Sequence, residues 1–324
     1  MQSVLELPHI DDGQQPLSLR QELAALTTES VDETMHDLDL KNTAALVLAM
    51  NAHDQLVPIA VRRAAPSITR AVDAITERMQ RGGRLIYIGA GTPGRLGILD
   101  ASECPPTFGT DPSLVVGLIA GGAEAIRTAV EGAEDSGELG ARDLEGLRLN
   151  LNDAVVGISA SGRTPYVLGA LTFANQSGAL TVSVACNHGS KIGAIAQIPI
   201  EMMLGPEFLA GSTRLKAGTA QKLVLNMLST LTMIRLGKTF GNLMVDLEAT
   251  NQKLIARAEQ TVMSVTGVTA NAATDAIREA GGSVKEAILA ILADLSAPEA
   301  HELLQLHAGS LRAALRDAAT SITE

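Results

Sequence analysis

The chain has 324 residues, 46% hydrophobic and 19% charged, and carries a formal net charge of −11. Proteins that bind nucleic acid normally present a basic face and aromatic stacking surfaces, so this charge and an aromatic content of 2% argue against a nucleic-acid partner. The two cysteines are too few for a disulfide framework, and the six histidines lack the spacing of metal ligands, so we expect no metal site.

The start of the chain and its apolar runs predict a cytoplasmic protein with no membrane partner. No run of about 18 uncharged apolar residues occurs, and the first residues lack a basic segment followed by an apolar core. Residues 1–27, which contain Pro8 and Pro16, are predicted to form a flexible N-terminal arm. Helical apolar spacing then predicts two helices, over residues 40–50 and 57–79.

Five short apolar runs are predicted to be β-strands: residues 84–88, 114–119, 154–158, 179–185 and 198–203. Helical patterns lie between them, at residues 123–132 and 165–176. This alternation is typical of an α/β fold, a three-layer α-β-α domain around a five-stranded parallel sheet. In such sheets ligands bind beyond the carboxyl ends of the strands.

After the sheet, long helices are predicted over residues 217–236 and 242–257. The sequence pattern then changes to short helical segments interrupted by Gly281-Gly282 and by Pro298, which indicates a small C-terminal helical bundle. We therefore expect three parts: the arm at 1–27, the α/β domain with its N-terminal helices at 28–258, and the helical domain at 259–324.

The loop after the first strand, residues 89–94, reads Gly-Ala-Gly-Thr-Pro-Gly and precedes a helix. Free backbone N–H groups and the positive end of the helix dipole make such a loop an anion site, with Gly91 and Thr92 as candidate phosphate ligands. The pattern also fits a dinucleotide fingerprint, which needs an acidic residue at the end of the second strand. That strand ends in Ile119-Ala120-Gly121-Gly122, so the dinucleotide interpretation is weakened.

A hydroxyl-rich turn follows the third strand, at residues 159–164. Its hydroxyls and N–H groups predict a second part of a phosphate cradle, although one serine in such a turn can also be an ordinary helix cap. The candidate ligands there are Ser159, Ser161, Arg163 and Thr164.

Two carboxylates are candidates for acid and base catalysis. Glu103 precedes Pro105 and Pro106, which are expected to fix a turn after the helix, and Glu134 is expected near the end of the helix that follows the second strand. Two carboxylates held in different environments suit general acid and general base chemistry. Both residues can equally be solvated loop acids, and their spacing does not show that they converge.

A third cluster, residues 205–222, is predicted to open the long helix. Hydroxyls and cations at a helix start can donate to an anionic sugar or can simply be solvated. The candidate ligands there are Glu207, Ser212, Thr213, Lys216 and Lys222.

Taken together, these motifs resemble the N-acetylmuramic acid 6-phosphate etherase family, a branch of the sugar isomerase (SIS) domain proteins. The resemblance runs from about residue 28 to residue 257, and the last 60 or so residues resemble the family's small helical tail. Its most specific strings are Ala-Ser-Glu-Cys-Pro-Pro-Thr, around Glu103, and Gly-Ser-Thr-Arg-Leu-Lys-Ala-Gly-Thr-Ala-Gln-Lys, which ends at Lys222.

The resemblance implies a cofactor-independent lyase that removes D-lactate from N-acetylmuramic acid 6-phosphate and leaves N-acetylglucosamine 6-phosphate, in cell-wall sugar recycling. A base takes the C2 proton of the ring-opened sugar, lactate leaves C3, and water adds to the unsaturated aldehyde. By the same resemblance Glu103 is the general acid and Glu134 a base, with the division of steps between them open. A homodimer with the site near its interface is also implied.

The chain departs from the family at Pro93, where the family has serine, so the loop lacks one hydroxyl and one N–H. We expect weakened, not abolished, use of the sugar phosphate. Two alternatives remain: a non-catalytic sugar-phosphate sensor, which the presence of both Glu103 and Glu134 disfavours, and an SIS-type isomerase, which the Glu-Cys-Pro-Pro string disfavours.

Overall fold

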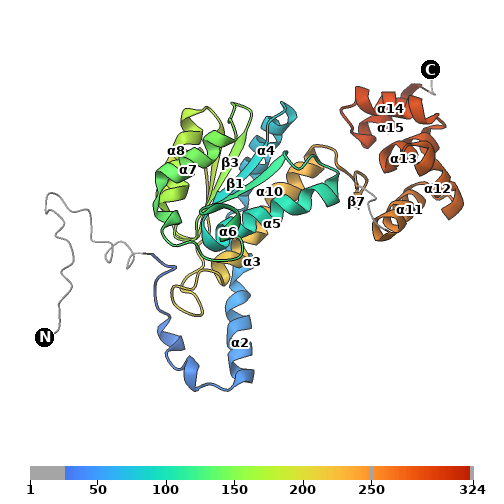
Figure 1. Cartoon of the computed structure of the whole chain (residues 1–324). Helices are drawn as coiled ribbons and strands as arrows, with labels where there is room; N and C mark the ends of the chain where they lie inside the picture. Colours follow the sequence, from blue (N-terminus) through green and yellow to red (C-terminus); the bar gives the residue numbers. More distant parts are fainter. Residues whose placement is uncertain (1–25, 248–251, 322–324) are drawn as a thin grey trace, which may run out of the picture.

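The computed structural model describes residues 26–247 and 252–321, so residues 1–25 of the predicted arm lie outside the described residues (Figure 1). A five-stranded, wholly parallel sheet has the strand order β2-β1-β3-β4-β5. All five predicted strands are confirmed: β1 (Leu85–Gly89), β2 (Val115–Ile119), β3 (Ala154–Ile158), β4 (Leu180–Ala185) and β5 (Ile198–Glu201).

Helices cover both faces of the sheet, as unbroken apolar strands require. One face carries α3 (Leu56–Arg63), α4 (Ala65–Gln80), α5 (Gly91–Phe108) and α10 (Lys216–Arg235). The other face carries α7 (Gly137–Gly146), α8 (Pro165–Gln176) and the short α9 (Lys191–Ile195). After β2 come α6 (Gly122–Ala125) and the 3-10 turn η3 (Ala133–Asp135). The predicted three-layer α-β-α fold is confirmed.

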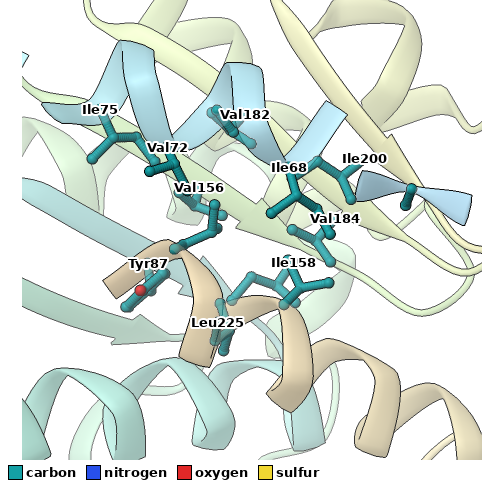
Figure 2. Close-up of a cluster of buried hydrophobic side chains, with 14 of the residues drawn as sticks. Ile68, Val72, Ile75, Tyr87, Val156, Ile158, Val182, Val184, Ile200 and Leu225 are labelled. Atoms are coloured by element: carbon teal, nitrogen blue, oxygen red, sulfur yellow. The ribbon is translucent and has the colours of Figure 1, made fainter. Parts of the chain in front are cut away.

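Two apolar clusters hold the layers together. Successive strand side chains point to opposite faces, so Tyr87 joins one cluster while Ile86 and Ile88 join the other. Figure 2 shows the first cluster, with side chains of α4, of four strands and of α10 packed against one another. Each fully buried aliphatic side chain stabilises the fold by about 1.5–3 kcal/mol, so the strand ends that carry the loops are rigidly placed.

Four predicted helices differ from the structure, and three of them precede the third strand. The helix expected over 57–79 is two helices, α3 and α4, because Pro66 in the first turn of α4 cannot donate to a preceding carbonyl. The helix expected over 123–132 shrinks to α6, since the β-branched Ile126, Thr128 and Val130 are poor helix formers. The helix expected from 40 begins later, as α2 (Thr43–Asp54), where the Asn42 side chain caps it.

Part of the helix predicted over 242–257 is instead a small hairpin, β6 (Thr239–Phe240) and β7 (Leu243–Met244). Its two-residue loop is Gly241-Asn242, and the φ of +60° at Gly241 favours glycine. Two 3-10 turns, η1 (Glu33–Met35) and η2 (Leu38–Leu40), precede α2.

The C-terminal helical bundle is confirmed. Its helices are α11 (Gln252–Thr266), α12 (Ala270–Glu279), α13 (Val284–Ala293), α14 (Ala297–Leu306) and α15 (Leu311–Ser321). Its buried cluster already includes Val245, Leu247 and Ala258, so this core begins before the domain boundary placed at residue 259 from the sequence.

Candidate active site

The loops after β1 and β3 form one cavity of about 430 Å³. These two strands are neighbours in the sheet, with Gly89 paired to Ile158, so their carboxyl ends lie side by side. Eight of the predicted site residues line this cradle cavity: Gly91, Thr92, Glu134, Ser159, Ser161, Arg163, Thr164 and Thr213. The structure therefore brings together residues that are up to 122 positions apart, from 91 to 213.

Hydrogen bonds hold the hydroxyl-rich turn at residues 159–164, called the serine turn below, in one conformation. The Ser159 and Thr164 hydroxyl oxygens lie 2.7 Å apart, and the Gly162 N–H donates to Ser159 Oγ at 3.0 Å. Gly162 has a φ of +74°, and a Cβ there would lie 2.4 Å from the Ser190 Cβ, so the turn needs glycine. Hydroxyls held in this way suit an anion that accepts several hydrogen bonds at once.

The start of α5 supplies the opposite wall of the cavity. The helix begins at Gly91, and the first N–H groups of a helix have no intrahelical acceptor, so they are available to an anion. Pro93 lines the same cavity and has no N–H to offer. This is the place where the chain departs from the family it resembles.

Carboxylates line the cradle cavity beside the hydroxyls. Glu134 and Asp135 come from the exposed turn η3, and Glu29 comes from the segment before η1. Glu29 is a residue that sequence reasoning missed. Asn187 fixes the position of the segment that carries Glu29. The Asn187 side chain accepts a hydrogen bond from the Thr27 N–H (2.8 Å) and donates one to the Ala160 carbonyl (3.2 Å).

Glu103 lies in a different cavity. It was expected in a turn, but it sits within α5, which continues through Pro105 and Pro106 to Phe108. The turn prediction is wrong because Cys104 and Phe108 pack into the apolar core and keep the last turn helical. Gly91 and Glu103 are twelve residues apart on one helix, which separates their Cα atoms by about 18 Å.

The cavity around Glu103 has a volume of about 440 Å³ and lies between α5, α10 and the β6–β7 hairpin. We call it the Glu103 cavity. Lys222, expected beside the phosphate, lines this cavity instead, and its amino group pairs with Asp100 at 2.8 Å. Asp100 is a second residue that sequence reasoning missed, since nothing in its spacing marks it.

Glu207 and Lys216 are buried and bind the protein itself. The Glu207 carboxylate accepts hydrogen bonds from the N–H groups of Lys216 and Ala217, both at 2.9 Å, and so caps α10. The Lys216 amino group donates to the Leu204 carbonyl at 3.0 Å. Burial lowers the pKa of Lys216, and the nearby Glu207 charge opposes that shift. Neither residue lines the cradle cavity, and neither does Ser212.

A family sequence model and a solved structure are similar to part of this chain. The sequence model of the glucokinase regulatory protein N-terminal SIS domain matches residues 67–175. A solved phosphoheptose isomerase from Neisseria gonorrhoeae is 14% identical, with a TM-score of 0.46, over 59% of this chain and 98% of its own.

Two curated relatives match over nearly their whole length. The N-acetylmuramic acid 6-phosphate etherase of Streptomyces avermitilis is 57% identical over 92% of this chain and 96% of its own. That of Vibrio vulnificus is 55% identical over 91% of this chain and 99% of its own. At this identity and coverage, the chain belongs to the N-acetylmuramic acid 6-phosphate etherase family.

Proposed function

We propose that this chain is an etherase that cleaves the D-lactyl ether of N-acetylmuramic acid 6-phosphate, giving D-lactate and N-acetylglucosamine 6-phosphate. The name of its relatives and the cradle cavity, which sets hydroxyls and N–H groups opposite carboxylates, together support this function. The substrate derives from cell-wall sugar, so we place the reaction in cell-wall recycling in the cytoplasm.

In the proposed site the phosphate lies between the start of α5 and the serine turn. The donors there are N–H groups, the hydroxyls of Thr92, Ser159 and Thr164, and the guanidinium of Arg163. Arginine is suited to this task because its planar fork binds phosphate through two parallel hydrogen bonds.

Glu134 is the proposed base, because it lies in the cradle cavity beside the phosphate donors. Its carboxylate removes the C2 proton of the ring-opened sugar, and the C3–O bond then breaks, with the electron pair leaving on the lactate oxygen. A general acid protonates that oxygen. Water next adds at C3 of the unsaturated aldehyde and a proton returns to C2, so the sum of the steps is hydrolysis of the ether.

Glu103 is the proposed general acid, and a second copy of the chain is proposed to deliver it. The separation of about 18 Å along α5 keeps Glu103 of the same chain away from a sugar held at Gly91. A homodimer in which the Glu103 cavity of one copy faces the cradle cavity of the other brings both carboxylates to one substrate.

The surface of α2 and α3 supports a dimer. Four large apolar side chains on these helices are exposed: Val47 (61%), Leu48 (72%), Leu56 (49%) and Ile59 (51%). In Figure 1, α2 projects from the sheet domain. Large apolar side chains exposed on two successive helices are typical of an interaction site. By length and composition alone, the segment Thr43–Arg63 could also span a membrane. Asp54 interrupts this apolar segment, and Arg62 and Arg63 end it. We therefore assign the exposed apolar surface to contact with a second copy of the chain.

The activity is tested by incubating the full chain with N-acetylmuramic acid 6-phosphate and measuring D-lactate with a stereospecific dehydrogenase. We expect release by the wild type and a loss of at least about 100-fold in Glu134→Gln, the range for removing a general base. Wild-type protein that binds the sugar phosphate without releasing D-lactate would contradict the proposal and favour a sensor.

The shared site is tested by co-expressing Glu103→Ala and Glu134→Ala chains with two different tags and purifying the doubly tagged dimer. Each such dimer contains one intact shared site, so we expect about half of the wild-type activity per dimer. A doubly tagged dimer as inactive as its two parents would place both carboxylates in one chain. A doubly tagged Glu103→Ala dimer is the matched control.

A further inference from the structure

A second, smaller cavity lies beside the cradle cavity. β1 is the neighbour of both β2 and β3, and the cradle cavity extends to the β3 side of the loop that follows β1, where Ser159 lies. The smaller cavity extends to the β2 side, where Ala120 lies, and has a volume of about 150 Å³. Both cavities are lined by Ala90, Gly91 and Glu134, so they form neighbouring parts of one site.

Arg95 is the one cation among the described residues that line this smaller cavity, which we call the Arg95 cavity. Arg95 follows Gly91 by four residues on α5, so both lie on one face of the helix. Helical side chains lean toward the N-terminus of their helix, and this directs the Arg95 side chain toward the start of α5. Its charge is therefore close to the place where the phosphate is proposed to bind.

The guanidinium of Arg95 is held in place and keeps donors for a ligand. Its Nε–H donates to the Ile126 carbonyl at 2.9 Å. Within residues 26–247 and 252–321, no acceptor or carboxylate pairs with the N–H groups on its two Nη atoms. Glu131 and Glu134 line the cavity too, but both are exposed and neither forms an ion pair with Arg95. A guanidinium in this state suits a planar anion, which it binds through two parallel hydrogen bonds.

Most of the remaining wall is apolar. Ala120 and Ala125 are buried, and Ala129 and Val130 complete this wall. None of the described residues that line the Arg95 cavity carries a hydroxyl, whereas the cradle cavity has several. Since one water takes about 30 Å³, the cavity has room for a group of about five non-hydrogen atoms. It therefore suits a small group that combines an apolar part with one negative charge.

We propose that the Arg95 cavity holds the D-lactyl group of the substrate and that Arg95 binds its carboxylate. The proposal rests on the etherase function proposed above. Beyond its ether oxygen the lactyl group consists of a CH, a methyl and a carboxylate, which match the alanine wall and the Nη donors. The acetamido group of the sugar is similarly small but carries no charge for Arg95 to bind.

The position of Glu134 agrees with this assignment. Glu134, the proposed base at C2, lines both cavities, and the next carbon of the sugar, C3, carries the lactyl ether. A sugar with its phosphate in the cradle cavity and C2 at Glu134 thus presents its lactyl group to the Arg95 cavity. Because Glu131 and Glu134 repel a carboxylate, Arg95 is the residue that makes this cavity accept one. We infer that Arg95 determines specificity for a carboxylate-bearing ether.

The test compares N-acetylmuramic acid 6-phosphate with its analogue in which the lactyl carboxylate is a carboxamide. Formation of N-acetylglucosamine 6-phosphate is measured for both compounds with the wild type, Arg95→Met and Arg95→Lys. Loss of hydrogen bonds to a charged group lowers affinity by about 10- to 100-fold. We expect kcat/KM for the acid to fall by that factor in Arg95→Met and by less in Arg95→Lys. We expect the wild type to prefer the acid by a similar factor, and Arg95→Met to change kcat/KM for the carboxamide by less than about threefold.

Two controls separate the lactyl contact from other effects. Arg127→Met removes an exposed arginine that follows Ile126 and lines neither cavity, and it is expected to leave kcat/KM for both compounds unchanged. The product N-acetylglucosamine 6-phosphate carries the phosphate and the acetamido group but no lactyl group. Its inhibition constant is expected to stay within about twofold in Arg95→Met.

Equal losses for the acid and the carboxamide in Arg95→Met, or a weakened inhibition by the product, would overturn the inference. The first result indicates a structural role, and the second indicates that Arg95 binds the phosphate or the acetamido group. If Arg95→Met does not fold, Arg95→Lys and the preference of the wild type decide. Wild-type protein that converts neither compound would refute the proposed function instead. Calorimetry then decides this inference, which requires Arg95→Met to weaken binding of N-acetylmuramic acid 6-phosphate but not of N-acetylglucosamine 6-phosphate.

Discussion

Glu207→Gln tests whether the buried carboxylate before α10 stabilises the fold or binds substrate. The structure supports the first role, because Glu207 is 2% exposed and caps α10 through two hydrogen bonds of 2.9 Å, from the N–H groups of Lys216 and Ala217. Glutamine keeps one acceptor oxygen but loses the charge and turns an NH₂ group toward one of these donors.

The magnitude follows from those two contacts. A hydrogen bond to a charged group contributes about 1.5–3 kcal/mol, and a buried donor left unpaired costs about 1–3 kcal/mol, so we expect the free energy of unfolding to fall by about 2–4 kcal/mol. For a chain of 324 residues that corresponds to a decrease in Tm of about 3–6 °C. KM is expected to stay within about twofold, since Glu207 does not line the cradle cavity.

The loss of stability in Glu207→Gln depends on pH because the amino group of Lys216 lies near Glu207. Burial lowers the pKa of Lys216 below its usual value, and the Glu207 charge opposes this, so the variant lowers that pKa further. Where the unfolded chain binds a proton that the folded chain lacks, stability rises with pH. The stability deficit of Glu207→Gln is therefore expected to shrink between pH 7 and pH values near 10.

The assay combines thermal unfolding of wild type and variant at several pH values with KM for N-acetylmuramic acid 6-phosphate. An unchanged Tm together with a KM raised about tenfold or more would refute the structural role and return Glu207 to the substrate site.

Three further predictions concern the cradle and the sheet. Pro93→Ser restores a hydroxyl and an N–H to the loop, and a gain of about 1.5–3 kcal/mol lowers KM by about 10- to 100-fold; an unchanged KM would contradict it. Ser159→Ala removes the hydroxyl that contacts Gly162 and Thr164, and steady-state kinetics are expected to show KM raised about tenfold; Tm is expected to fall as well, because the buried Gly162 N–H loses its acceptor, and an unchanged KM would contradict the phosphate role. Asp153 is fully buried, and although burial raises its pKa, hydrogen bonds from Arg84 and Asn150 outweigh that effect and leave the pKa below its usual value. Asp153→Asn is therefore expected to cost about 2–4 kcal/mol at pH 7 in urea unfolding, with the difference shrinking as the pH falls below about 4.

The sheet and the cradle are readable in the sequence because both depend on local patterns. A strand buried on both faces is an unbroken apolar run, as Val155-Val156 shows, and a glycine or serine turn that follows such a strand falls at the edge where parallel strands end. These two patterns are enough to predict that Thr92 and Ser159 lie near one another, and both residues line the cradle cavity.

The roles of Glu103 and Glu207 depend on long-range geometry, which spacing does not encode. The two prolines after Glu103 suggest a turn, yet burial of Phe108 holds the segment in α5 and carries Glu103 away from Glu134. Glu207 caps a helix that begins nine residues later, a contact made only when the intervening loop folds back. Glu29 enters the cradle cavity through the Asn187 contact with Thr27, across 160 residues.

The central claim, an etherase that works by elimination and hydration, is tested most directly by running the reaction in deuterium oxide and analysing both products by mass spectrometry. We predict D-lactate without carbon-bound deuterium and N-acetylglucosamine 6-phosphate with one deuterium at C2, because the proton that the base removes exchanges with solvent before it returns. An amino-sugar product without deuterium at C2, or the absence of D-lactate, would contradict the account.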